Sequence, residues 1–271
     1  MKRVLIISYY WPPSGGVTVH RCLKFAKYLR QFGWEPVVFV PKNAHYPYTD
    51  NSTYRDIPPG LEIIRGRIIE PFRLFKLLTG RKGAMINPIH VRDKEPGLIE
   101  KLLIWIRANY FIPDARALWI RPSVRKLIRY LKKNPVDAIF SDGPPHTNTV
   151  IALRIAKKTG IPWIADFQDP WTQVDYYKLF PIGKRADRKH HRLEQETFQT
   201  AKKITTVSPS WKDDLESIGA KDVGVIYYGY DEDDFRGRPK ANAGIEKYSV
   251  EKQTEILAGF LNKIIRINKT K

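Results

Sequence analysis

The chain has 271 residues, of which 42% are hydrophobic and 12% aromatic, and it carries a formal net charge of +19. This length and composition exclude a disordered chain and suffice for one large domain with a full hydrophobic core. The charge is uneven, because residues 65–133 hold 17 Lys and Arg against 5 Asp and Glu. Such a bias predicts an anionic partner, which would be lipid, nucleic acid or a phosphorylated substrate, although a merely soluble basic surface would look the same.

The single cysteine, Cys22, excludes an internal disulfide and is expected to be a packed thiol on a helix. The apolar start VLIIS is too short for a signal peptide. No stretch approaches the roughly 18 uncharged apolar residues of a membrane-spanning helix. We therefore expect a cytoplasmic protein that contacts a membrane at most from one side, at the inner face of the plasma membrane.

Strand-like and helix-like patterns alternate along the chain. The sequence predicts strands over residues 3–8, 36–40, 61–65, 136–141, 162–166, 203–208 and 223–228. It predicts helices over residues 18–32, 123–133, 146–158, 184–200 and 210–218. Several helices end at a glycine, such as Gly33, as helix C-termini often do. Short loops between alternating strands and helices indicate a single Rossmann-like α/β domain, a parallel sheet with helices on both faces.

Two regions interrupt this alternation. Residues 41–60 contain several prolines and tyrosines and are expected to form a long ordered loop. Residues 71–121 include PFRLFKLLTGRKG and GLIEKLLIWIRANYFIPDARALWI, which are basic, aromatic and amphipathic. That composition is typical of elements that lie on an anionic membrane surface. A helical hairpin packed on its own domain would have the same pattern, and the two interpretations are compatible.

The C-terminal segment is unusual. We expect a domain over residues 1–235, a polar linker over residues 236–244 and a helical segment over residues 245–271. Ser249 is a suitable N-cap, and apolar residues follow at helical spacing from Ile256 to Ile265. A helix with such a stripe is expected to pack back on the first domain.

The segment WPPSGG, residues 11–16, lies between the first strand and the first helix. Glycines at this place let backbone N–H groups approach a phosphate, which the helix dipole also favours. The segment is neither a P-loop nor a dinucleotide fingerprint, and a structural tight turn explains it equally well. Gly15 and Gly16 are substrate-binding candidates, together with Arg21 on the helix that follows.

The segment SDGPPHTNT follows the strand at residues 136–141 and places His146 at the start of a helix. A histidine at this edge of the sheet is suited to hydrogen-bond a substrate or to transfer a proton. A helix-capping histidine is the alternative interpretation.

The segment WIADFQDPWTQ follows the next strand and contains Asp166, Asp169 and Trp171. Paired carboxylates act as bases or bind sugar hydroxyls, whereas Asp before Pro often fixes a loop. We favour a functional role for Asp169, a structural role for Asp166 and an aromatic wall at Trp171. The segment YYGYDEDDF closes the last strand and predicts a turn or hinge at Gly229 and Asp231.

Four segments occur in an order that resembles a known family: RVLIISYYWPPSGGVTVHRCLKFAKYLRQFGWEPVVFVP, FSDGPPHTNTVIALRIAKKTGIPWIADFQDPWT, ITTVSPSWKDDL and VIYYGYDEDDF. Together they resemble the N-terminal domain of bacterial retaining glycosyltransferases of family 4, which have the GT-B fold. The resemblance covers residues 1 to about 235. It implies that Gly15 and Gly16 lie near the donor diphosphate and the acceptor. It also implies catalytic roles for His146, near the transferred sugar, and Asp169, on the acceptor side.

Two positions depart from the family pattern. Gln168 stands where the family has arginine, and Tyr228 stands where the hinge has asparagine. The family also has a second Rossmann-like domain that binds the nucleotide, and no such domain follows Phe235, although the last helix resembles the family's final crossover helix. We therefore expect a chain from which that domain is missing.

The resemblance implies the acceptor-binding half of an enzyme of cell-surface polysaccharide synthesis. Its donor would be a nucleotide diphosphate-sugar and its acceptor a glycan or a lipid-linked glycan, with no metal and no cofactor. The chain alone is expected to be inactive. The alternative is a non-enzymatic basic domain that binds anionic lipid or nucleic acid, although no nucleic-acid motif is present.

Overall fold

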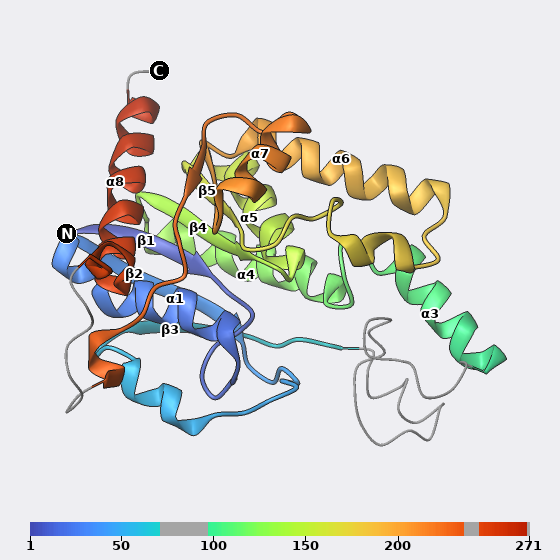
Figure 1. Ribbon diagram of the computed structural model, residues 1–271, viewed down its shortest axis with the longest axis horizontal. Coiled ribbons are helices and arrows are strands. Elements are labelled where there is room, and N and C mark those ends of the chain that lie inside the picture. The colour runs from blue at the N-terminus through green and yellow to red at the C-terminus, as the bar shows by residue number, and fades with distance from the viewer. Residues whose placement is uncertain (71–96, 236–243, 270–271) are drawn as a thin grey trace.

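The computed structural model describes residues 1–70, 97–235 and 244–269 (Figure 1). Its seven strands form one sheet in the order β3-β2-β1-β4-β5-β6-β7, and every neighbouring pair is parallel. The strands are β1 (Lys2–Ile7), β2 (Trp34–Pro41), β3 (Glu62–Gly66), β4 (Ala138–Gly143), β5 (Trp163–Phe167), β6 (Lys203–Thr206) and β7 (Val223–Val225). The chain thus winds outward from β1 in one direction and from β4 in the other, which confirms the predicted Rossmann-like α/β fold.

The helices cover both faces of this sheet. The α-helices are α1 (Val17–Tyr28), α3 (Leu98–Tyr110), α4 (Ile120–Lys133), α5 (His146–Thr159), α6 (Lys184–Thr200), α7 (Pro209–Ser217) and α8 (Val250–Lys269). Short 3-10 helices are η1 (Leu29–Phe32), η2 (Asn51–Asp56), η3 (Ala117–Trp119), η4 (Asp175–Leu179), η5 (Glu232–Phe235) and η6 (Glu246–Tyr248). Helix α3 stands away from the body of the domain (Figure 1).

The central strands contribute side chains to two separate cores, because successive residues of a strand point to opposite faces. On β1, Val4 and Ile6 pack with α1 and α8, whereas Leu5 and Ile7 pack with α4 to α7. The continuous apolar run of β1 therefore reflects a strand that is buried on both sides.

Several predicted boundaries differ from the structure. Helix α1 ends at Tyr28, and the 3-10 helix η1 continues it to Gly33, which is left-handed at φ +78°. Strand β7 ends at Val225 because the N–H of Tyr227 donates to the Gln253 side chain of α8 at 2.8 Å. The predicted loop over residues 41–60 contains η2, which Asp50 caps by accepting from the N–H of Ser52.

Helix α8 packs on the same face of the sheet as α1. Leu257, Leu261 and Ile264 are buried in one core with Leu23 and Leu29. Most of the expected linker, residues 236–243, and part of the basic region, residues 71–96, lie outside the described residues. In the part of the chain that is described, none of the helices combines the length and apolarity needed to cross a membrane.

Candidate active site at the carboxyl edge of the sheet

A buried network of polar side chains joins the carboxyl ends of β1, β4 and β5. Its centre is Asp142, at the end of β4, whose carboxylate accepts from the Ser8 hydroxyl at 3.0 Å and from Asn148 Nδ2 at 2.7 Å. Gln168 Nε2 lies 3.5 Å from the same carboxylate, and the Tyr228 hydroxyl donates to Gln168 Oε1. The network therefore fixes the positions of the loops that carry the predicted site residues.

Asp142 was not predicted from the sequence, although it lies inside the quoted SDGPPHTNT segment. Its side chain is fully buried, and burial raises the pKa of its carboxyl to about 7, against the effect of the Ser8 hydrogen bond. An acidic residue at the carboxyl end of a buried strand is the signal that could have identified it. A carboxyl that titrates near neutral pH makes the network sensitive to protonation.

Arg21 and Asp166 form a buried ion pair. Arg21 Nε lies 2.7 Å from Asp166 Oδ2 and Nη2 lies 2.8 Å from Oδ1, so the contact is bidentate. Arg21 also donates to the carbonyl of Ile226, and the Thr205 hydroxyl donates to Asp166 at 2.6 Å. Because Arg21 is only 4% exposed, we propose that it positions the strand ends and does not contact the substrate directly.

The glycine-containing turn is held by the chain's own backbone. The Gly15 N–H donates to the carbonyl of Tyr48 at 2.9 Å, and the Asp50 N–H donates to that of Pro13 at 2.8 Å. A Cβ on Gly15 would lie 3.4 Å from the Asp50 side chain, whereas Gly16 needs glycine for its φ of +86°. The backbone of the turn therefore packs closely against residues 48–50. Gly16 is exposed and is the N-cap residue of α1, where no side chain caps the helix.

His146 is packed among aromatic rings at the start of α5. Its imidazole stacks on Trp171 with ring centroids 4.5 Å apart and planes 5° apart. The Trp171 indole N–H donates to His190 Nδ1 at 3.0 Å. Trp171 is only 3% exposed, so we propose that it holds His146 in place and is not itself a sugar platform.

Burial keeps both histidines neutral at physiological pH. It lowers the pKa of His146 to about 3 and that of His190 to about 4, because a charged imidazole is poorly solvated there. His146 therefore carries no positive charge there; it is 8% exposed, and its Nδ1 lies 3.4 Å from the Thr149 hydroxyl.

Acidification is expected to destabilise the fold through these two histidines. In the unfolded chain a histidine takes up a proton near its ordinary pKa of about 6.5, whereas the folded protein resists it down to the lowered values. The stability that they contribute is therefore complete above about pH 6.5 and is lost as the pH falls toward 4. We expect a loss of roughly 1–2 kcal/mol per histidine between pH 7 and pH 5 in urea denaturation.

The substitution His146→Phe tests this assignment, because phenylalanine retains the stacking on Trp171 and cannot titrate. Its free energy of unfolding should fall less between pH 7 and pH 5 than that of the unmodified protein. An unchanged pH dependence would contradict the assignment.

Asp169 is a half-buried carboxylate on the loop after β5. Within residues 1–70, 97–235 and 244–269, no group donates a hydrogen bond to it, and burial alone raises its pKa. Burial, and to a smaller extent the charge of Asp169, raises the pKa of Tyr176 to about 12. A partly desolvated carboxylate whose hydrogen-bonding capacity is unused is suited to bind a hydroxyl.

A second acid at this edge was also missed from the sequence. Asp114 accepts from the Thr147 N–H at 2.8 Å and from the Thr147 hydroxyl at 2.9 Å. It thus caps α5 from a distant segment, next to His146, and its negative charge suits the helix N-terminus. A cap from 33 residues away leaves no local signal in the sequence.

The predicted hinge residues lie where the segment after β7 passes α8. A Cβ on Gly229 would come within 2.8 Å of both the Tyr248 carbonyl and the Val250 nitrogen, so this position requires glycine. Asp231 is buried, and it accepts from Lys24 and Lys27 at 2.7 Å each and from the Tyr28 hydroxyl at 2.7 Å. Burial alone would raise the pKa of Asp231, but these donors outweigh it and hold the pKa well below its usual range.

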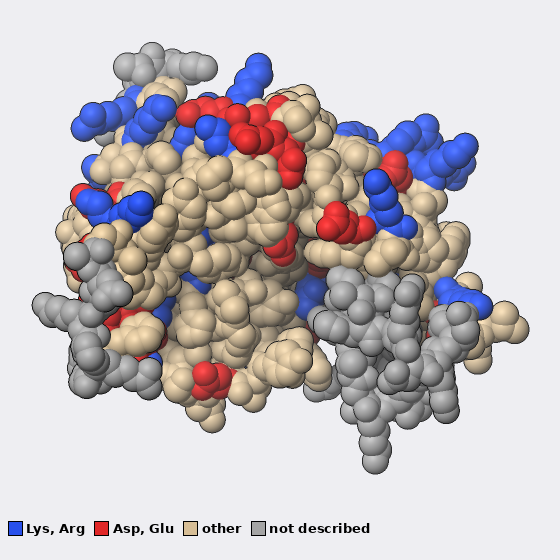
Figure 2. Space-filling view, viewed as in Figure 1, with Lys and Arg blue, Asp and Glu red and all other residues tan. Residues whose placement is uncertain are grey.

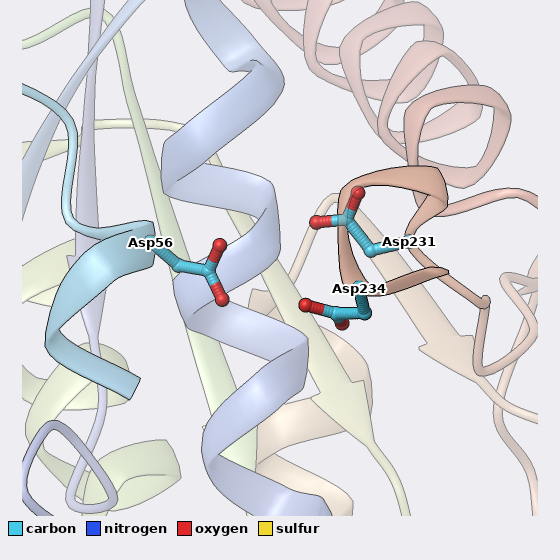
Figure 3. A group of neighbouring side chains, drawn as sticks. All are labelled: Asp56, Asp231 and Asp234. Atoms are coloured by element: carbon cyan, nitrogen blue, oxygen red, sulfur yellow. The ribbon is translucent and has the colours of Figure 1, made fainter. Parts of the chain in front are cut away.

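Three carboxylates, those of Asp56, Asp231 and Asp234, converge beside α1 (Figure 3). Their oxygens lie within 4.8 Å of one another, as in a cation site. The Lys24 ammonium lies 2.7 Å from Asp56, 2.7 Å from Asp231 and 3.0 Å from Asp234. Lys27, which pairs with Asp56 and Asp231, and Arg55, which pairs with Asp234, supply the two further positive charges that balance the three carboxylates. The cluster therefore ties η2 and the segment after β7 to α1.

His146 and Trp171 thus stack on each other at the ends of β4 and β5, and Asp169 lies on the same loop as Trp171. Gly15 and Gly16 lie at the end of β1, which the Ser8–Asp142 hydrogen bond joins to β4. Gly229 and Asp231 lie beside α8 and α1, at the end of β7, and form a separate structural cluster.

A doubly wound parallel sheet with polar loops at its carboxyl edge defines an α/β domain of the ligand-binding class. The sequence model of Glycosyltransferase Family 4 matches residues 85–234, which is more than half of the chain. The chain therefore belongs to Glycosyltransferase Family 4, as the motifs indicated, and family membership supports sugar transfer in general.

Solved structures are similar to this chain in fold. One is the sucrose-phosphate synthase of Thermosynechococcus elongatus, at 14% identity and a TM-score of 0.52, where the match covers 87% of this chain and 50% of that one. Another is a glycosyltransferase of Streptomyces sp. SF2575, at 17% identity and a TM-score of 0.44, with coverage of 89% and 57%. The chain therefore spans about half the length of these proteins. None of the curated proteins matches it.

Proposed function

We propose that these 271 residues form the acceptor-binding half of a retaining glycosyltransferase. The observation that carries this proposal is Asp169, a half-buried carboxylate with unused hydrogen-bonding capacity on the loop whose Trp171 stacks on His146. Family membership supports sugar transfer, and the strand ends supply the place for it.

The reaction would move a sugar from a nucleotide diphosphate-sugar to an acceptor hydroxyl. The bond from the anomeric carbon to the diphosphate oxygen breaks, and a bond to the acceptor oxygen forms on the same face of the sugar. The acceptor proton leaves with the nucleotide diphosphate. Asp169 would accept a hydrogen bond from the acceptor hydroxyl, and neutral His146 would contact the transferred sugar.

The glycine turn would lie beside the donor diphosphate. Gly16 is exposed, starts α1 and has no side-chain cap, so the free N–H groups of the first turn suit an anionic group. In the enzymes that the chain resembles, a second domain holds most of the nucleotide. We therefore expect these residues on their own to transfer sugar poorly or not at all.

The acceptor would be a glycan or a lipid-linked glycan of cell-surface polysaccharide synthesis. The basic region over residues 71–121 supports a site at the inner face of the plasma membrane, since it would attract anionic headgroups. Residues 71–96 lie outside the described part of the chain, so the structural support comes from α3.

Acceptor binding is testable without turnover. Saturation-transfer NMR with a panel of methyl glycosides should detect weak binding, and Asp169→Asn should lower the affinity at least about tenfold by removing a charged acceptor. Asp175→Asn, at an exposed carboxylate of the same loop, is the matched control and should leave binding unchanged. Equal binding by the Asp169→Asn variant, or sugar transfer by these 271 residues alone, would contradict the proposal.

A further inference from the structure

Helix α3 exposes a continuous apolar stripe. Leu98, Leu102 and Trp105 are 86%, 56% and 43% exposed, and their spacing places them on one face of the helix. Asn109 continues this face by one further turn. Its side-chain amide donates to the Pro181 carbonyl at 2.9 Å, and its oxygen accepts from the Gly183 N–H at 2.7 Å. The stripe therefore leads directly to the amino end of α6.

The amino end of α6 is strongly basic. Lys184, Arg185, Arg188 and Lys189 are all exposed, and Figure 2 shows Lys and Arg side chains gathered there. The preceding segment adds the exposed Lys178 and Leu179. The acids nearby are Asp175 and Asp187, so basic residues remain in excess.

We propose that this surface docks on an anionic lipid bilayer. The docking surface consists of Leu98, Leu102 and Trp105 of α3, Leu179 of η4, and Lys184, Arg185 and Arg188 of α6. The apolar stripe with its tryptophan is suited to insert at the boundary of the acyl chains. The clustered lysines and arginines beside it are suited to bind the anionic headgroups. Charge complementarity is what selects a bilayer over a neutral apolar partner.

The proposal deepens the proposed function and rests on it for one consequence. The loop that begins at Asp169 runs on to Leu179, so one segment carries both the candidate site and part of the docking surface. A domain docked through this surface would hold its carboxyl edge near the headgroups. The acceptor class that fits is therefore a lipid-linked glycan.

Vesicle sedimentation tests the surface. The protein should bind vesicles of phosphatidylcholine mixed with phosphatidylglycerol and bind phosphatidylcholine alone much more weakly. The pair Leu98→Glu with Leu102→Glu, and separately the pair Lys184→Glu with Arg185→Glu, should each weaken binding at least about tenfold. All these positions are exposed, so thermal melting should remain unchanged.

The matched control is Lys132→Glu with Lys133→Glu at the end of α4. It makes the same change of charge on the exposed basic face of α4. None of the large apolar side chains described in this helix is exposed. Its effect should be clearly smaller. Equal weakening by both charge variants, or no effect of the α3 variant, would overturn the proposal.

Other occupants would give different results. Absence of vesicle binding with tight, steeply salt-dependent DNA binding would assign the basic residues to nucleic acid. If the protein were a dimer that the α3 variant converts to a monomer, again without vesicle binding, the surface would be an interface with a second copy of the chain. Either result would overturn the proposed membrane docking. The proposed function would be unaffected, because glycan binding at Asp169 is tested in a separate experiment.

Discussion

Replacing Asp166 by asparagine is expected to lower the free energy of unfolding by about 3–5 kcal/mol. The carboxylate and the Arg21 guanidinium are both buried and are joined by hydrogen bonds of 2.7 and 2.8 Å. Asparagine keeps the shape of the side chain but leaves the guanidinium charge without a counter-ion in the interior. Denaturation in urea, followed by circular dichroism, measures the loss.

The matched control is Glu196→Gln, which removes a carboxylate from an exposed ion pair. Lys157 Nζ lies 3.1 Å and Arg192 Nε 3.5 Å from this carboxylate, and the side chains of Lys157 and Glu196 are 49% and 31% exposed. The loss should stay below about 1 kcal/mol, because water solvates the charge that remains. A similar loss in the two variants would show that burial of the Arg21–Asp166 pair has no special importance.

Replacing Leu257 by alanine is the second large effect and should cost about 2–5 kcal/mol. Leu257 is fully buried where α8 packs with Leu23 and Leu29, on the face of the sheet that α1 covers. Alanine would leave a cavity that the rigid strands β1 and β4 cannot fill by relaxation. The free energy of unfolding again provides the measurement.

On the same helix, Ile267 is 41% exposed and provides the comparison. Ile267→Ala should change stability by about 0.5 kcal/mol or less, as most surface substitutions do. If Leu257→Ala were as mild, α8 would not be docked on α1 in solution.

Both substitutions remove contacts to α1, which connects the candidate site to the rest of the domain. Arg21 links it to β5, Lys24 and Lys27 link it to Asp231 after β7, and Leu23 links it to α8.

The two departures from the family pattern turn out to contact each other. The Tyr228 hydroxyl donates to Gln168 Oε1, and Gln168 Nε2 faces Asp142. A neutral amide can donate to one partner and accept from the other, which an arginine cannot do. The two residues thus connect the segment after β7 to the loop of Asp169 by hydrogen bonds.

The fold and the positions of most helices and strands could be predicted from the amino-acid sequence. Buried strands such as β1 and amphipathic helices such as α1 are visible because their hydrophobic periods are local properties of the chain. The motifs also identified the sugar-transferase family and located His146 and Asp169 at strand ends, because loops after parallel strands share one edge of the sheet.

Which of those residues remain accessible to a ligand depends on how the strands and helices pack. Arg21 and Trp171 are buried by partners 145 and 19 residues away, and Asp114 caps a helix 33 residues further on. The central role of Asp142 likewise depends on Ser8, which is distant in sequence. Such contacts join residues far apart in the chain, and no periodicity or spacing records them; side-chain burial and pairing become defined only when the strands assemble.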